Sequence, residues 1–265
     1  MLFSFLTLFL MPIRVLKMEY IAEFWLANWF LAPIFFIIIL TINLFFAFNW
    51  QIIKHTEKGN WDGIITILEK RIYEKKIITY TNVKLLVHSY FLLGKELKIK
   101  NLEKYVKDKK TAIYNKTFLM FCCANLISYS NSYLKTYLAE AVDNKALKGM
   151  NWILMNYAFV LISGKEFDKA LMALKKIEKD KKNRVLYLTK LYFLYVASHQ
   201  EDRENIALLK ENFTKKINIK KFEKEFEMEK GDIHILFLSK IINQAKEWAY
   251  GQPSEANSPS NKEAS

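Results

Sequence analysis

The sequence FWLANWFLAPIFFIIILTINLFFAFNWQII runs from Phe24 to Ile53 and contains no charged residue. About 20 helical residues, at 1.5 Å each, cross the roughly 30 Å hydrocarbon layer of a bilayer, so this stretch is long enough to span one. A charged side chain near its centre would cost about 2.5–3.5 kcal/mol on insertion, and none is present. Trp25, Trp29 and Trp50 lie near its ends, as in an interfacial aromatic belt. The stretch predicts one transmembrane helix over residues 24–55.

The two ends of the chain differ from this span. Residues 1–23 begin with an apolar run that is too short to cross a bilayer as a helix, and Pro12 interrupts it. We expect an interfacial anchor or part of a signal-like segment there, and Met18 is an alternative start. The tail 251–265, which begins with Gly251, has no large apolar side chain, so we expect it to be disordered.

The chain carries a formal net charge of +13, and all of this positive charge comes from residues 54–250. A basic domain beside a bilayer is attracted to anionic lipid headgroups, by about 1 kcal/mol for each basic residue near the surface. An acidic protein partner would be attracted by the same field. Alternatively, the lysines only solvate helix faces in a chain rich in Lys, Asn and Ile.

Residues 56–250 have the pattern of an all-α domain. No proline occurs between Ile34 and Gln252, which is typical of helices joined by short turns. Phe167, Ala170, Leu174 and Ile177 recur at helical spacing. The expected helices span 59–74, 80–94, 99–109, 112–128, 131–143, 147–163, 166–179, 184–199, 202–214, 217–229 and 232–249.

The helix pairs repeat. The aromatic residues Tyr133 and Phe167 are thirty-four residues apart, which is the tetratricopeptide period. In residues 151–177 an aromatic-rich helix leads through Gly-Lys-Glu-Phe-Asp-Lys-Ala, starting at Gly164, into a second helix with alanine. Gly-Asn-Trp-Asp-Gly-Ile, starting at Gly59, is similar to the same turn. Here the chain resembles a tetratricopeptide-repeat protein.

The resemblance implies that the transmembrane helix is followed by an α-solenoid of antiparallel helix pairs, and the last helix, 232–249, would then cap the array. The units depart from the family because none ends in its common proline. In that family, the first helices of the pairs line a concave surface that holds a peptide or a partner's helix. The polar candidates on the predicted first helices are Asn82, Lys84, Asn115, Lys116, Asn151 and Asn156.

No motif for catalysis, a metal or a cofactor was found: the sequence has no phosphate-binding loop and no HExxH. His88 lies on an apolar helix face and is interpreted as a core residue. Asp232 is interpreted as a helix N-cap rather than a metal ligand. The adjacent Cys122 and Cys123 lie in an apolar run, which predicts buried free thiols. The basic runs mix with acidic residues, so solvated helix faces are favoured over nucleic-acid binding.

The positive-inside rule gives the orientation of the span. Arg14 and Lys17 precede it, and Lys54, Lys58 and the Lys70-Arg71 pair follow it. The count places the repeat domain in the cytoplasm, and an exterior or periplasmic domain behind an uncleaved signal anchor is the alternative.

The sequence therefore predicts a non-enzymatic, single-pass membrane scaffold that binds a protein or peptide, with an acidic partner favoured by its lysines. Two alternatives stay open. One is a structural subunit of an envelope-spanning or motor-associated complex, and the other is an array that docks a separate membrane enzyme. The oligomeric state stays open as well.

Overall fold

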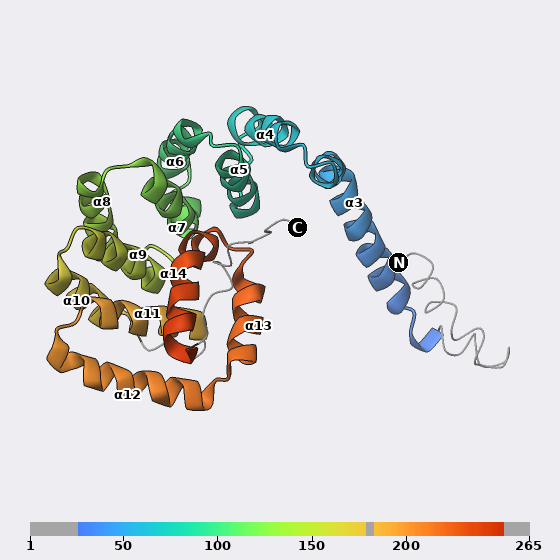
Figure 1. Cartoon of the computed structure of the whole chain (residues 1–265). Coiled ribbons are helices and arrows are strands. Elements are labelled where there is room, and N and C mark those ends of the chain that lie inside the picture. Colours follow the sequence, from blue (N-terminus) through green and yellow to red (C-terminus); the bar gives the residue numbers. More distant parts are fainter. Residues whose placement is uncertain (1–25, 179–182, 252–265) are drawn as a thin grey trace, which may run out of the picture. The chain divides into compact units, whose positions relative to one another are not determined.

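The computed structural model describes residues 26–178 and 183–251. All of the secondary structure assigned within these residues is helical (Figure 1). The predicted segment 1–23, Trp25 and the tail 252–265 lie outside the described residues. The all-α prediction is confirmed. The elements are α3 (Leu31–Glu57), α4 (Trp61–Glu69), η1 (Lys70–Glu74), α5 (Tyr80–Leu92), α6 (Glu96–Lys109), α7 (Thr111–Ser128), α8 (Asn131–Asp143), α9 (Met150–Ser163), α10 (Phe167–Lys176), α11 (Arg184–Ala197), α12 (Gln200–Lys216), α13 (Ile219–Glu229) and α14 (Ile233–Tyr250).

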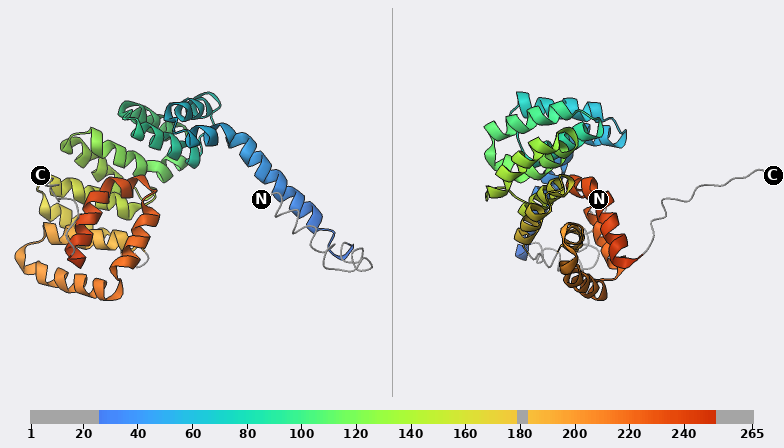
Figure 2. Two further views of the ribbon diagram at one scale, coloured as in Figure 1. Left: turned by 45° about the vertical axis from the view of Figure 1, so that its right-hand side comes forward. Right: turned by 60° about the vertical axis from the view of Figure 1, so that its left-hand side comes forward.

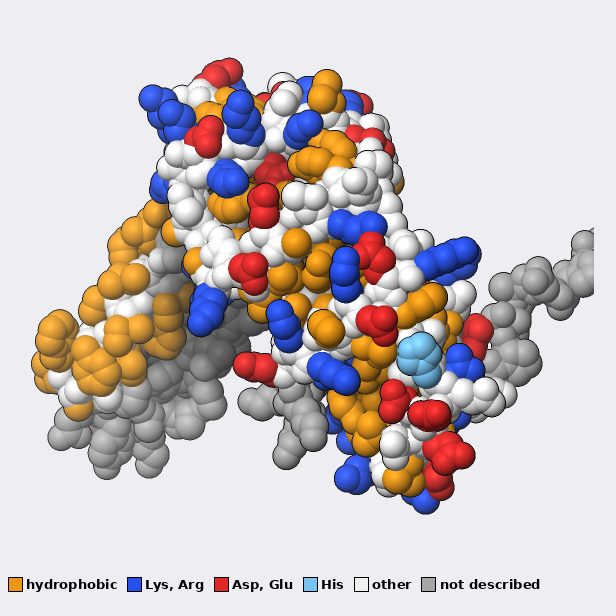
Figure 3. All heavy atoms as spheres, turned by 90° about the vertical axis from the view of Figure 1, so that its left-hand side faces the viewer, with side chains coloured by type: hydrophobic (Ala, Val, Ile, Leu, Met, Phe, Trp, Pro, Cys, Tyr) orange, Lys and Arg blue, Asp and Glu red, His pale blue; other side chains and the backbone are white. Residues whose placement is uncertain are grey.

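Helix α3 is long and apolar enough to cross a membrane over Pro33–Glu57, and the most apolar window of this segment contains no buried residue. Up to Ile53 this helix carries no charged side chain, and hydrophobic side chains cover its visible surface (Figure 3). Thr41 Oγ1 donates to the Ile37 carbonyl at 2.7 Å and Asn43 Nδ2 to that of Ile39 at 2.9 Å. These bonds satisfy polar groups that lipid could not.

The start of this helix differs from the predicted span, which began at residue 24. The structure has a turn over residues 28–30 and begins α3 at Leu31. Pro33 explains the difference, because proline lacks an N–H and is tolerated in the first turn of a helix but breaks its interior.

The chain divides into two compact units, residues 1–63 and 64–265, a few residues after the predicted domain boundary at 55. Within the first unit, the start of α4 packs closely on the end of α3. A Cβ added at Gly63 would lie 2.3 Å from His55 Nδ1, so only glycine permits this approach without a shift. The close contact explains why the boundary falls after Gly63.

The second unit contains two layers of paired helices. The first helices of the pairs, α5, α7, α9, α11 and α13, each contact the next one, forming an inner layer. Each of the second helices α6, α8 and α10 contacts two first helices, the one before it and the one after it. Helix α6, for example, packs on α5 and α7. Such stacking buries apolar faces that a single pair would leave in water. The structure thus has the expected paired helices, with most ends within three residues of the prediction.

Helix α14 does not cap the array, and this prediction is wrong. Instead it folds back onto the inner layer and contacts α7 and α11, as well as α12 and α13 (Figure 2). Its ring contacts also reach α9, where Phe237 lies 6.0 Å from Phe159 between ring centroids. Leu238, Ile242 and Ala245 are fully buried on one stripe of the helix. The main packing partner of α14 is therefore α11 rather than its neighbour in sequence, α13.

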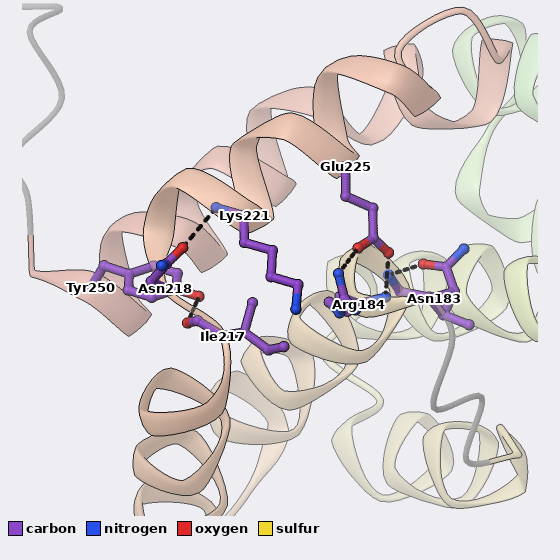
Figure 4. A network of polar contacts seen from close by, with 8 residues as sticks. Asn183, Arg184, Ile217, Asn218, Lys221, Glu225 and Tyr250 are labelled. Atoms are coloured by element: carbon purple, nitrogen blue, oxygen red, sulfur yellow. Dashed lines mark hydrogen bonds and ion pairs between the residues drawn. The ribbon is translucent and has the colours of Figure 1, made fainter.

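The last helices are also held by polar contacts (Figure 4). Glu225 of α13 accepts from the main-chain N–H of Arg184 at 3.0 Å and from its Nη1 at 2.8 Å. Asn218 caps α13 by accepting from the N–H of Lys221, and the Tyr250 hydroxyl donates to the Ile217 carbonyl at 2.8 Å. These contacts fix α13 to the start of α11, and the end of α14 to the turn between α12 and α13.

Candidate functional site

A cavity of about 140 Å³ lies between α5, α7, the turn before α9 and the start of α14. We call it the cationic pocket and define it by the lysine, histidine and aspartate residues that line it. They are Lys84, His88, Lys116, Lys148, Asp232 and His234.

Helices α5 and α7 supply one wall. Lys84 and His88 are four residues apart on α5 and therefore lie on the same face. Thr79 caps this helix by accepting from the N–H of Asn82 at 3.2 Å, which sets where the helix begins. Lys116 follows in the second turn of α7 and is exposed.

The turn before α9 supplies Lys148. Its main-chain N–H donates to the carbonyl of Asn115 at 2.9 Å, which holds the turn against α7. The next residue, Gly149, is the N-cap of α9 and has φ of 77°, a left-handed conformation that glycine adopts without strain. The N-terminus of α9 thus lies in the pocket wall.

The start of α14 closes the pocket. Lys84 Nζ lies 2.8 Å from Asp232 Oδ1, and this hydrogen bond raises the pKa of Lys84. Asp232 is the N-cap residue, as predicted, but its side chain makes no capping bond because it turns to Lys84 instead. Burial lowers the pKa of His234 to about 4, and burial together with Lys84 lowers that of His88. Both imidazoles are therefore neutral near pH 7.

The pocket is positively charged. Three lysines and one aspartate line it, and Asp232 already pairs with Lys84. Within residues 26–178 and 183–251, neither Lys116 nor Lys148 forms an ion pair. Two positive charges are consequently left without a carboxylate partner from this part of the chain.

The six predicted partner-binding residues separate into three groups, at the cationic pocket, at a second cavity and in the interior. Lys84 and Lys116 line the cationic pocket, and Asn115 contributes the carbonyl that holds its turn. Asn151 lies away from them in a second cavity of about 520 Å³, where its Oδ1 accepts from the N–H of Glu178 at 3.3 Å. Glu178 and Asn183 also line that cavity, and residues 179–182 lie outside the described residues.

Asn82 and Asn156 are buried, so the prediction that they face a partner is wrong. Asn82 is 9% exposed, and its Nδ2 donates to the Ile77 carbonyl at 3.0 Å, completing the turn before α5. Asn156 is fully buried and its Nδ2 lies 3.5 Å from Cys122 Sγ. The apolar run around Asn156 in the sequence is a signal that could have identified it as interior.

Cys122 and Cys123 are buried free thiols, as predicted. Burial raises the pKa of Cys123 to about 12 and that of Cys122 well above its ordinary value. The thiols are therefore protonated, and unreactive, at neutral pH.

Two pocket residues were not found by sequence reasoning, namely Lys148 and His234. They come from segments far apart in the chain, and no local motif links them. His88, predicted to be a core residue, is only half-buried and faces the pocket. In the part of the chain that the structure describes, no group of three His, Cys, Asp or Glu side chains could hold a metal ion.

A family model described as an uncharacterised Treponema protein matches residues 98–251, which is more than half of the chain. The chain belongs to this family. The family match begins within α6 and ends just after α14, so it covers the returning helix but neither α3 nor α5. No curated protein and no solved structure matches the chain. The tetratricopeptide resemblance stays a prediction.

Proposed function

We propose that this chain is a non-enzymatic, membrane-anchored adaptor whose helical domain binds a partner protein with acidic side chains. The observation that carries the proposal is α3, a helix of 27 residues whose apolar window contains no buried residue. Such a surface is unfavourable in water and favourable in lipid. The chain follows this helix with a separate compact unit that carries all of the net positive charge.

The partner surface is expected on the outside of the helical domain, because α14 covers the inner layer. Exposed apolar side chains occur on the outer helices α6, α10 and α12, and also on α13. These are Leu97 (73% exposed), Met172 (65%), Leu208 (58%) and Met228 (76%). Charged residues lie among the hydrophobic ones on the visible face (Figure 3). A surface with exposed apolar side chains and an excess of lysine suits a partner that has both apolar and acidic side chains.

The same exposed apolar side chains favour a second candidate, a structural subunit of an envelope-spanning or motor-associated complex. A permanent complex buries more apolar surface than a transient adaptor does. The two candidates differ in how the partner responds to salt, because an apolar interface is less sensitive to it than a charged one.

Photo-cross-linking in intact membranes tests the proposal. A photo-reactive amino acid replaces Met172 or Leu208 in the full chain. As a matched control, the same amino acid replaces Lys145, an exposed residue in the turn between α8 and α9. We expect defined cross-linked products from the first two positions. A salt wash before irradiation should abolish these products for an adaptor and leave them unchanged for a structural subunit. Absence of any product from these exposed apolar positions would contradict both candidates.

Topology is tested in the same cells. A reporter active on one side only, fused after residue 251, is expected to report the cytoplasm, since Lys54, Lys58 and the Lys70-Arg71 pair follow the span. Activity only on the exterior side would move the partner search to that compartment.

A further inference from the structure

The cationic pocket has two positive charges in excess of its negative charge. Lys84 and Asp232 neutralise each other, whereas Lys116 and Lys148 have no carboxylate partner among the described residues. The remaining pair of charges matches a dianion better than a monoanion. A phosphate monoester carries about −1.5 to −2 charges at pH 7, and a carboxylate carries only one.

Two helix starts add to this field. The N-cap residues of α9 and α14, Gly149 and Asp232, both line the cavity. Helix N-termini present unpaired N–H groups and a partial positive charge, which phosphate groups commonly accept. Lysine, as a point charge, suits phosphate as well.

The cavity also limits the size of the ligand. Its volume of about 140 Å³ is close to that of a cavity of about 150 Å³ that accommodates one benzene molecule. A single phosphate group fits inside this space, whereas a whole nucleotide is too large to be enclosed by it. Neutral His88 and His234 each retain one ring N–H that can donate to a phosphate oxygen.

We propose that the cationic pocket binds one dianionic phosphate group, held by Lys116 and Lys148 over the N-termini of α9 and α14. The group is either free inorganic phosphate or the monoester headgroup of a lipid such as phosphatidate. The carboxylate of Asp232 repels the anionic ligand, and its ion pair with Lys84 holds that side chain in place. The site does not depend on the partner-binding surface proposed above.

The test titrates the purified full chain, in a neutral detergent without phosphate, with inorganic phosphate at constant ionic strength. The amide resonances of Gly149 and His234 report on the two helix starts. We expect saturable shifts with inorganic phosphate, and about tenfold weaker binding of the monoanions dimethyl phosphate and acetate, because half of the charge is lost.

Single-charge variants assign the site. Lys116→Gln and Lys148→Gln should each weaken phosphate binding about tenfold, while Lys145→Gln, an exposed lysine in the same turn that does not line the cavity, should leave it within about twofold. Asp232→Asn should tighten binding several-fold, since it removes the one negative charge. A merely structural role of these lysines would not produce a gain in the last variant.

Several results would overturn the assignment. Non-saturable shifts, equal binding of acetate and phosphate, or an equal effect of Lys145→Gln would indicate diffuse surface charge. A phosphatidate-containing vesicle that competes with inorganic phosphate identifies the lipid source, and a vesicle that does not compete identifies the free ion. Competition by phosphatidylglycerol vesicles equal to that by phosphatidate would refute the preference for a dianion.

Discussion

Replacing Leu238 of α14 by alanine tests whether this helix belongs to the inner core of the domain. Leu238 is fully buried. Its truncation removes about three carbon groups, worth about 0.8 kcal/mol each on transfer, and leaves a cavity. Buried Leu→Ala changes cost about 2–5 kcal/mol, so we expect a loss of about 3 kcal/mol in the free energy of unfolding.

Leu236→Ala is the matched control. The same residue type changes on the same helix, so the gain in helix propensity is equal in both variants. Leu236 is 42% exposed, so its truncation leaves no closed cavity and should cost about 1 kcal/mol or less. Urea unfolding of the full chain in detergent, followed by circular dichroism, measures the difference. With a slope of about 2 kcal/mol/M, the two midpoints should differ by about 1 M.

Hydrogen exchange locates the effect. Because α14 contacts α7 and α11, Leu238→Ala should lower amide protection in these helices as well as in α13. A terminal cap would affect its immediate neighbour alone. Equal costs for the two variants, or a loss of protection confined to α13, would refute the placement of α14 on the inner layer.

Three further predictions concern other parts of the chain. Ile42→Arg near the middle of α3 should cost about 2.5–3.5 kcal/mol on insertion and release the chain from membranes in carbonate extraction, whereas Thr56→Arg at the helix end should not; equal retention of both would argue against a span. Cys122 and Cys123 should react with a thiol reagent only in denaturant, because burial raises both pKa values; fast labelling of the folded chain would disprove their burial. Because burial lowers the pKa of His234 from 6.5 to about 4, the unfolded chain takes up its proton first as the pH falls. Stability should therefore decrease over that window, and His234→Gln should reduce the slope in urea unfolding; an unchanged slope would show that another group titrates.

Local pattern was sufficient for the helices. The prediction of a helix over 131–143 matches α8, because apolar spacing and the absence of proline are local properties. The start of α3 was placed too early, since the length of the charge-free run outweighed the effect of Pro33. Asn82 was predicted to lie on the surface because its side chain is polar. In the structure this side chain is buried, and its amide completes the turn before α5.

The candidate site was predictable only in part. Lys84 and Lys116 were identified from their positions on first helices, but their convergence with Lys148 and His234 depends on the return of α14. Nothing in the sequence between residues 84 and 234 indicates that these side chains meet. Charge and exposure of single residues were readable, whereas their grouping was not.

The sequence by itself determined the charge-free helix, the all-α class and the burial of the two thiols, because each depends on side-chain chemistry within one or two turns of a helix. The tertiary structure decided that α14 covers the inner layer and that its first residues complete the cationic pocket. That outcome depends on which apolar surface is large enough to receive the stripe of Leu238, Ile242 and Ala245. Such a surface is built by α7, α9 and α11 together, and it exists only after they have packed.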